Sequence, residues 1–261
     1  MPSSEPHGHL VQLYEDSDDV LVHDVAAYLF AGLEQGQGIV VVATTAHRDA
    51  FVKALQRLGA NVDRALATRT LKFFDAHFML ASFMVNGSPD GRLFDEVIGS
   101  GIRAAHARAA GRGLSVYGEM VGELWKTRQY RAAIDLERLW NTLRESLTFH
   151  LYCSYPVDLF DGLFEIGTLD EVLGTHTHLV PAGRDRDFES AVTRAMNDVL
   201  GSSGQGLRPL IEDRHRHAWA AMPRGAATLV WLRRNFPDKQ EEIVRLTRHY
   251  YQSTQALSRA H

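Results

Sequence analysis

The chain has 261 residues, which is long enough for one large domain or for a domain with an appendage, and for a sizeable buried core. Hydrophobic residues make up 45% and charged residues 23%, as in ordinary globular proteins. The formal net charge of -4 excludes a global basic field of the kind that attracts nucleic acid or anionic membranes. The one cysteine, Cys153, excludes an intramolecular disulfide and a cysteine-rich zinc site.

Strand-like and helix-like segments alternate through the first two thirds of the chain. The strand-like runs, such as GIVVVAT, are apolar on both faces, as expected of buried parallel strands. We therefore predict a mainly parallel α/β sheet with helices on both faces. The predicted strands are residues 10–14, 38–44, 70–76, 114–120 and 149–156, with a last edge strand within 174–182. The predicted helices are residues 18–33 (capped by Asp16 or Ser17), 47–59, 77–84, 93–110 and 131–147, and a turn is predicted at 86–91.

After Gly183 the pattern becomes wholly helical, which predicts a helical C-terminal appendage. The stretch AWAAMPRGAATLVWLRRNF, which carries Arg224, Arg233 and Arg234, is the candidate for a helix-turn-helix in this region. A recognition helix presents polar base-reading residues, whereas residues 229–232 (LVWL) are apolar all round. We favour a packing or oligomerisation helix over a DNA reader there. The predicted helices are residues 185–201, 207–222, 225–236 and 238–257, and the best linker candidate is GSSGQG at 201–206.

Several familiar motifs are absent from the sequence. No Gly-Lys pair exists for a phosphate-binding loop, no G-x-G-x-x-G follows a strand, and there is no G-x-S-x-G elbow. Conventional nucleotide binding and serine hydrolysis are therefore disfavoured. The N-terminus does not read as a secretory signal, and no apolar run reaches the ~18 residues of a membrane span. We expect a cytoplasmic protein without membrane association.

Three H-x-H pairs occur, at His7/His9, His176/His178 and His215/His217. On a strand this spacing puts both rings on one face, where a third ligand would complete a zinc site. No H-E-x-x-H motif or cysteine partner accompanies any pair. We interpret the histidines as polar surface or supporting groups, and predict neither a metal nor another cofactor.

Glu119 stands where the strand LSVYGEM ends. In open α/β sheets, ligands bind in the crevice beyond the carboxyl ends of the strands, and Gly118 leaves room for close approach to the backbone. Alternatively, Glu119 caps the following helix or pairs with an arginine. The segments YED at 14–16 and CSY at 153–155 occupy equivalent strand ends, so these residues are predicted to line one pocket with Glu119. The alternative for Cys153 is a small buried hydrophobe.

Taken together, ordered stretches of the chain resemble the MEDS domain, a sensory domain named for methanogen and methylotroph regulators that include the dichloromethane-responsive repressor. The matching stretches are HLVQLYED, YLFAGLEQGQGIVVVAT, LGANVD with LKFFDA, LSVYGEM, LERLWNTL, and FHLYCSYP followed by His176. The resemblance implies a sensory domain over residues 9–182 and an appendage over 183–261. It also implies a degenerate relative of RecA/KaiC-type ATPases, in which a short turn at 14–17 replaces the phosphate loop (Walker A).

The resemblance favours a non-catalytic sensory or regulatory module that binds a small ligand at the strand ends and signals to a partner protein or the transcription apparatus. Glu119 would accept hydrogen bonds from the ligand or hold an arginine such as Arg138. The alternatives are an enzyme with residual nucleotide hydrolase activity, using Glu119 as general base, and a DNA-binding regulator acting through the appendage. Homo-oligomerisation is a further possibility, and nucleic acid is the less favoured partner. The predicted ligand-binding residues are His9, Tyr14, Glu119, Glu137, Tyr155, Cys153 and His176.

Overall fold

The structure is a computed structural model that describes residues 8–14, 18–157, 171–180, 185–201, 203–204, 206–207 and 224–259. By its internal contacts the chain divides into two compact units. Unit 1 consists of Met1–Pro156 and Glu171–Val180, and unit 2 consists of Val157–Asp170 and Pro181–His261. The division into domains at residues 182 and 183 stays a prediction.

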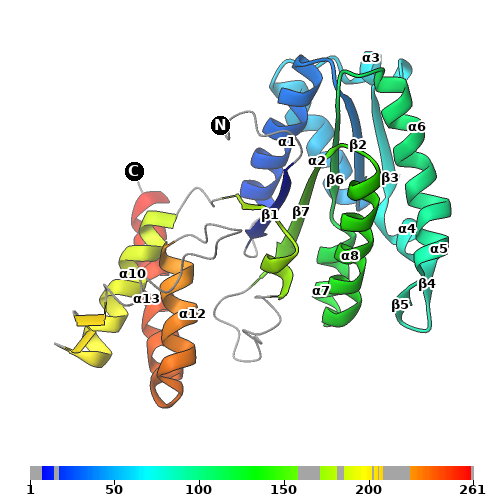
Figure 1. Ribbon diagram of the computed structural model, residues 1–261. Coiled ribbons are helices and arrows are strands. Elements are labelled where there is room, and N and C mark those ends of the chain that lie inside the picture. Colours follow the sequence, from blue (N-terminus) through cyan, green and yellow to red (C-terminus); the bar gives the residue numbers. More distant parts are fainter. Residues whose placement is uncertain are drawn as a thin grey trace. The chain divides into compact units, whose positions relative to one another are not determined.

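Unit 1 is built on a six-stranded parallel sheet with the order β3-β2-β6-β7-β1-β8 (Figure 1). Two strands inside the sheet, Gly38–Ala43 and Leu114–Gly118, are buried along almost their whole length, as expected of strands within a covered parallel sheet. The α/β class with a parallel sheet is thereby confirmed. The strands are β1 (His9–Tyr14), β2 (Gly38–Ala43), β3 (Leu71–Asp75), β6 (Leu114–Gly118), β7 (His150–Pro156) and β8 (His178–Leu179).

Helices cover both faces of this sheet, also as predicted (Figure 1). On one face, α1 (Asp18–Glu34) and α2 (Thr45–Arg57) pack against each other and share a core cluster with Tyr117 and Tyr152. On the other face, α8 (Tyr130–Ser146) places the Trp140 ring against Gly118. The remaining helices of the unit are α3 (Val62–Ala67), α4 (Ala76–Phe83), α5 (Gly91–Phe94), α6 (Ser100–Ala109) and α7 (Met120–Lys126).

The sequence-based elements needed several corrections. The helix predicted at 93–110 is divided by a π-helical turn, Asp95–Gly99, that separates α5 from α6. Of the turn predicted at 86–91, residues 86–87 form the tip of a hairpin between β4 (Met84–Val85) and β5 (Ser88–Pro89), while residue 91 already begins α5. The two strands of this hairpin were not predicted from the sequence, and neither were the short helices α3 and α7. The caps Asp16 and Ser17 and the helix at 207–222, with His215 and His217, lie outside the described residues, as does His7.

In the described part of unit 2, the long helices α10 (Asp185–Leu200), α12 (Arg224–Asn235) and α13 (Gln240–Arg259) pack on one another, and a short 3-10 helix, Pro237–Lys239, precedes α13. Leu229, Val230 and Leu232 of α12 are all buried. The helix therefore uses its apolar side chains for packing, as the sequence favoured. Among the described residues, none of the helices is long and apolar enough to cross a membrane.

Candidate functional site

The seven predicted site residues separate into two groups that lie on opposite sides of the sheet. Glu119 and Tyr14 lie near the carboxyl ends of β6 and β1, on the side of α1 and α2. The other five gather beneath α8, on the opposite face, and are His9, Glu137, Cys153, Tyr155 and His176. Cys153 lies in the middle of β7 rather than at its end. The prediction that Cys153 and Tyr155 line one strand-end pocket with Tyr14 and Glu119 is therefore wrong, and Glu15 and Asp16, which the same prediction included, lie outside the described residues.

At the strand ends, Glu119 is held by a network of its own. The residue occupies the N-cap position of α7, but its side chain makes no capping hydrogen bond. One carboxylate oxygen accepts a hydrogen bond from the backbone N–H of Thr44, and the other lies 2.5 Å from Nδ1 of His47 and 3.3 Å from the Tyr117 hydroxyl. We call Thr44, His47, Tyr117 and Glu119 the strand-end network.

His47 reaches Glu119 because of how α2 begins. Thr44 is the N-cap of α2 and accepts a hydrogen bond from the backbone N–H of His47, so the imidazole lies in the first helical turn beside the end of β2. The hydrogen bond to Glu119 raises the pKa of His47 against the opposing effect of burial, with further support from the charges of Glu119 and Asp18. Sequence reasoning missed His47, although its place three residues after a capping threonine was a usable signal.

Two expectations about Glu119 need correction. Arg138 does not pair with it: the guanidinium lies 2.8 Å from Asp135 and 3.8 Å from Glu171. Gly118 does not leave open space either, because a Cβ there would meet the Trp140 ring at 3.8 Å. Tyr14 is packed in the core of the α1–α2 face, and burial, followed by the charge of Glu119, raises its pKa.

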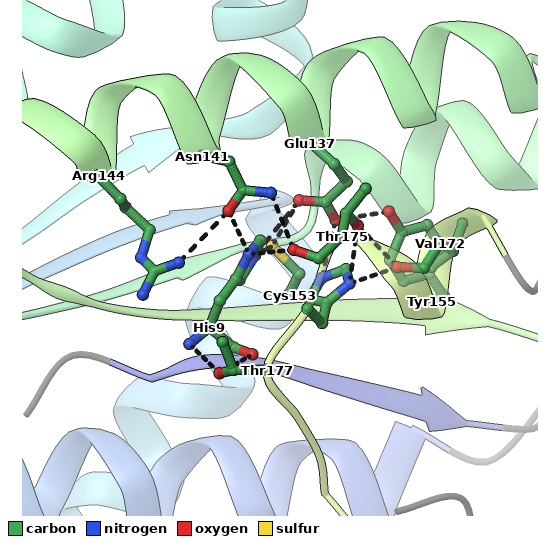
Figure 2. A network of polar contacts seen from close by, with 10 residues as sticks. His9, Glu137, Asn141, Arg144, Cys153, Tyr155, Val172, Thr175 and Thr177 are labelled. Atoms are coloured by element: carbon green, nitrogen blue, oxygen red, sulfur yellow. Dashed lines mark hydrogen bonds and ion pairs between the residues drawn. The ribbon is translucent and has the colours of Figure 1, made fainter. Parts of the chain in front are cut away.

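Beneath α8, four ligand-type side chains converge in the interior (Figure 2). Nε2 of His9 lies 3.4 Å from Oε2 of Glu137 and 3.5 Å from Sγ of Cys153. Nε2 of His176 lies 3.1 Å from Oε1 of Glu137. The four donor atoms all lie within 4.8 Å of one another, and all four residues are buried. We call His9, Glu137, Cys153 and His176 the buried cluster.

Each member of the buried cluster comes from a different element. His9 begins β1, Cys153 lies in β7, Glu137 lies in α8, and His176 lies between the helical turn at 171–174 and β8. The backbone N–H and carbonyl of His9 bond to Thr177, which fastens the segment carrying His176 to β1. The cluster thus joins parts of unit 1 that are far apart in the sequence.

A second layer of hydrogen bonds orients these side chains. Nδ1 of His9 faces the side-chain oxygen of Asn141 at 3.0 Å and the Thr175 carbonyl at 3.1 Å. Nδ1 of His176 faces the Val172 carbonyl at 2.7 Å. The Tyr155 hydroxyl donates to Oε1 of Glu137 at 2.5 Å. Tyr155 therefore supports the carboxylate, and Asn141, which extends the network, comes from the helix that provides Glu137 (Figure 2).

Burial and neighbouring charges shift the pKa values of His9, Glu137 and Cys153 in different directions. Burial lowers the pKa of His9 to about 4, with a contribution from the charge of His176. Burial alone would raise the pKa of Glu137, but the two histidines outweigh it, so that this pKa lies well below its usual range. Burial and the charge of Glu137 raise the pKa of the Cys153 thiol. Near neutral pH, the cluster accordingly contains a carboxylate, a neutral His9 and a protonated thiol.

Comparison with known proteins identifies the family. No curated protein and no solved structure matches the chain significantly. The family defined as MEDS, the methanogen/methylotroph, DcmR sensory domain, matches residues 8–177, well over half of the chain. The match begins one residue before His9 and ends one residue after His176, so it spans both the buried cluster and the strand-end network. The chain belongs to the MEDS sensory-domain family.

Proposed function

We propose that this protein is a non-catalytic sensory module in which unit 1 receives a signal at the buried cluster and passes it to unit 2 or to a partner protein. Family membership supports the sensory role. The rest of the proposal depends on the buried cluster, in which four predicted site residues (His9, Cys153, His176 and the adjoining Tyr155) surround the carboxylate of a fifth, Glu137. We place this activity in the cytoplasm, with a protein of a signalling pathway as the partner.

The connectivity of the chain gives the cluster a route to the helices. His176 belongs to Glu171–Val180, a short segment of unit 1 that is preceded by Val157–Asp170 and followed by Pro181–His261, both of unit 2. A change that fixes or releases this segment therefore affects both of the chain connections that lead from it to unit 2. A change at Glu137 or His9 reaches the segment directly, through His176 and Thr175.

The strand-end network supports a structural role for Glu119 rather than a catalytic one. A general base needs a free oxygen that faces its substrate. Both oxygens of Glu119 already accept hydrogen bonds, from Thr44 on one side and from His47 and Tyr117 on the other. The nucleotide hydrolase alternative and the relationship to RecA/KaiC-type ATPases remain hypotheses, and assays of ATP and GTP hydrolysis with Glu119→Gln test them.

The DNA-binding alternative is less well supported by unit 2. The apolar side chains of α12 face other helices, so a DNA reader would have to use the remaining surface. Binding to promoter DNA that weakens steeply with salt would favour this alternative.

Hydrogen exchange of the full chain tests the sensory proposal. His176→Ala removes the side chain that ties segment 171–180 to Glu137, so we expect faster amide exchange in that segment and in α10 and α13. His178→Ala is the matched control, because this neighbouring imidazole contacts Thr177 and stands outside the buried cluster. Unchanged exchange in α10 and α13 with His176→Ala would refute transmission from the cluster to unit 2.

A further inference from the structure

The hydrogen-bond partners of the two imidazoles fix where their protons are. A carbonyl oxygen only accepts, so Nδ1 of His176, 2.7 Å from the Val172 carbonyl, must carry a hydrogen. The same holds for Nδ1 of His9, which faces the carbonyl of Thr175 and the side-chain oxygen of Asn141. In the neutral imidazole the other nitrogen then has a bare lone pair. With both rings neutral, both Nε2 atoms would point bare lone pairs into the buried cluster.

The cluster does not contain enough protons to satisfy these lone pairs. Among the described residues, Nε2 of His176 has no hydrogen-bond partner, although it lies 3.1 Å from Oε1 of Glu137. Two lone pairs at that distance, buried away from water, repel each other unless a cation lies beside them. Tyr155 donates to Glu137 and not to the histidines, and Cys153 has a single proton. The cluster therefore needs one more positive charge, either a proton or a metal ion.

We propose that the buried cluster is a zinc site with His9, Glu137, Cys153 and His176 as its four ligands. Zinc binds nitrogen and oxygen at about 2.0–2.1 Å and sulfur at about 2.3 Å, so the corners of its tetrahedron lie about 3.4 Å apart, or about 3.6 Å where one is sulfur. The triangle formed by Nε2 of His9, Oε2 of Glu137 and Sγ of Cys153 has sides of 3.4, 3.5 and 3.6 Å. These separations match one face of that tetrahedron.

Charge and supporting contacts favour the same ion. Zn²⁺ displaces the thiol proton of Cys153 to the solvent, and the resulting thiolate and the carboxylate of Glu137 together neutralise the ion. A neutral site suits an interior position, where an unbalanced charge is costly. The Nδ1–H groups of both histidines donate to backbone carbonyls, which is how zinc-binding histidines are normally oriented. Four protein ligands leave no open position for water, so the site is structural or regulatory rather than catalytic.

Two different H-x-H motifs of the sequence each provide one histidine of the proposed zinc site. His9 and His176 belong to different H-x-H pairs, and both reach the cluster. His178 instead contacts Thr177. The zinc site names the ligand of the buried cluster, and its regulatory meaning rests on the proposed sensory function. Bound zinc would clamp segment 171–180 to β1, β7 and α8.

Cobalt provides a direct test, because Co²⁺ takes tetrahedral zinc sites and absorbs light when bound to a thiolate. Cys153 is the only cysteine, so a thiolate-to-cobalt charge-transfer band reports on this position alone. We expect the full chain, freed of metal with a chelator, to bind one Co²⁺ with this band, and added Zn²⁺ to abolish it. Cys153→Ser should remove the band completely, and Tyr155→Phe should weaken metal binding about 10- to 100-fold by releasing Glu137. The matched control, His178→Ala, removes a neighbouring imidazole outside the cluster and should leave the band unchanged.

The variant Glu137→Gln distinguishes loss of metal binding from loss of folding, because only metal binding should be affected. The amide nitrogen of Gln replaces one carboxylate oxygen and donates hydrogen to one bare Nε2 atom, that of His176 at the Oε1 position or that of His9 at the Oε2 position. The metal-free variant should therefore keep the urea midpoint of the metal-free parent while losing the cobalt band. Absence of the band in the folded parent protein, or its persistence in Cys153→Ser, would overturn the zinc site and leave the sensory proposal standing. A normal band with no difference in hydrogen exchange of α10 and α13 between metal-free and zinc-loaded protein would instead overturn the sensory proposal and leave the zinc site.

Discussion

The ion pair between His47 and Glu119 allows a quantitative prediction for His47→Gln. The two side chains are 7% and 3% exposed, and the imidazole Nδ1 lies 2.5 Å from the carboxylate. Removing one partner of a buried ion pair costs roughly 3–5 kcal/mol of unfolding free energy, because the other charge stays buried. Glu119 keeps its hydrogen bonds from Thr44 and Tyr117, so we expect a loss of about 2–4 kcal/mol.

The loss should also depend on pH with a definite sign. The pKa of His47 is raised in the folded protein, mainly by the hydrogen bond to Glu119. Its stabilising contribution is therefore fully present below the unfolded-state value of about 6.5 and disappears as the pH rises through the folded-state value. The difference between the parent protein and His47→Gln should be larger at about pH 6 than at about pH 9.

Urea unfolding measured by pulsed hydrogen exchange, read on peptides of unit 1, isolates this effect from unit 2. His77→Gln is the matched control: its Nε2 lies 2.7 Å from Glu123, but the side chain is 64% exposed. An exposed pair of this kind contributes about 0–1 kcal/mol. The reasoning is refuted if His47→Gln costs no more than His77→Gln, or if its cost is the same at both pH values.

Two further predictions concern packing and accessibility. Gly122→Ala should lower the unfolding free energy by about 1–3 kcal/mol, because the new methyl group would lie 2.6 Å from the Ser154 carbonyl oxygen. Gly101→Ala is the control: its methyl group would meet the Phe74 ring at an ordinary 3.6 Å, so this variant should raise the unfolding free energy by up to about 1 kcal/mol. Chemical denaturation of both variants measures this, and equal effects would contradict the close approach of α7 to β7. Cys153 should react with a thiol reagent such as DTNB only on unfolding, since it is fully buried and burial raises its pKa, and rapid labelling of the folded protein would show that the interior of this face is open.

Local sequence patterns were sufficient to predict the main strands and the long helices of this fold. The run from Gly38 to Ala43 has no polar residue and forms a buried strand as predicted. Helix α7 was missed because Met120, Val121, Leu124 and Trp125 are all buried, which leaves no amphipathic period to detect. Likewise, β4 and β5 have two residues each, too few for an alternating pattern.

The grouping of site residues depended on information that no local pattern contains. Whether Glu119 meets His47 is decided by the pairing of β2 with β6, in which Val42 lies opposite Gly118. Whether Cys153 faces α8 or α1 is decided by which face of β7 is turned toward each helix, and a shift of one residue would reverse it. The residue types at the site were readable from the sequence, but the sheet order and the strand faces separated them into two networks.

Counting donors and acceptors then distinguishes the roles of these networks. At the strand ends, a histidine with a raised pKa supplies the proton that a buried carboxylate needs, and the backbone of Thr44 supplies another, so Glu119 is satisfied by the protein alone. Beneath α8, both histidines direct Nδ1 toward backbone carbonyls, and in the part of the chain that the structure describes, Nε2 of His176 faces Glu137 without a hydrogen-bond donor. A buried polar group without a partner destabilises the fold unless something binds there. The first network is therefore suited to holding the ends of β2 and β6 together, and the second to binding an ion from solution.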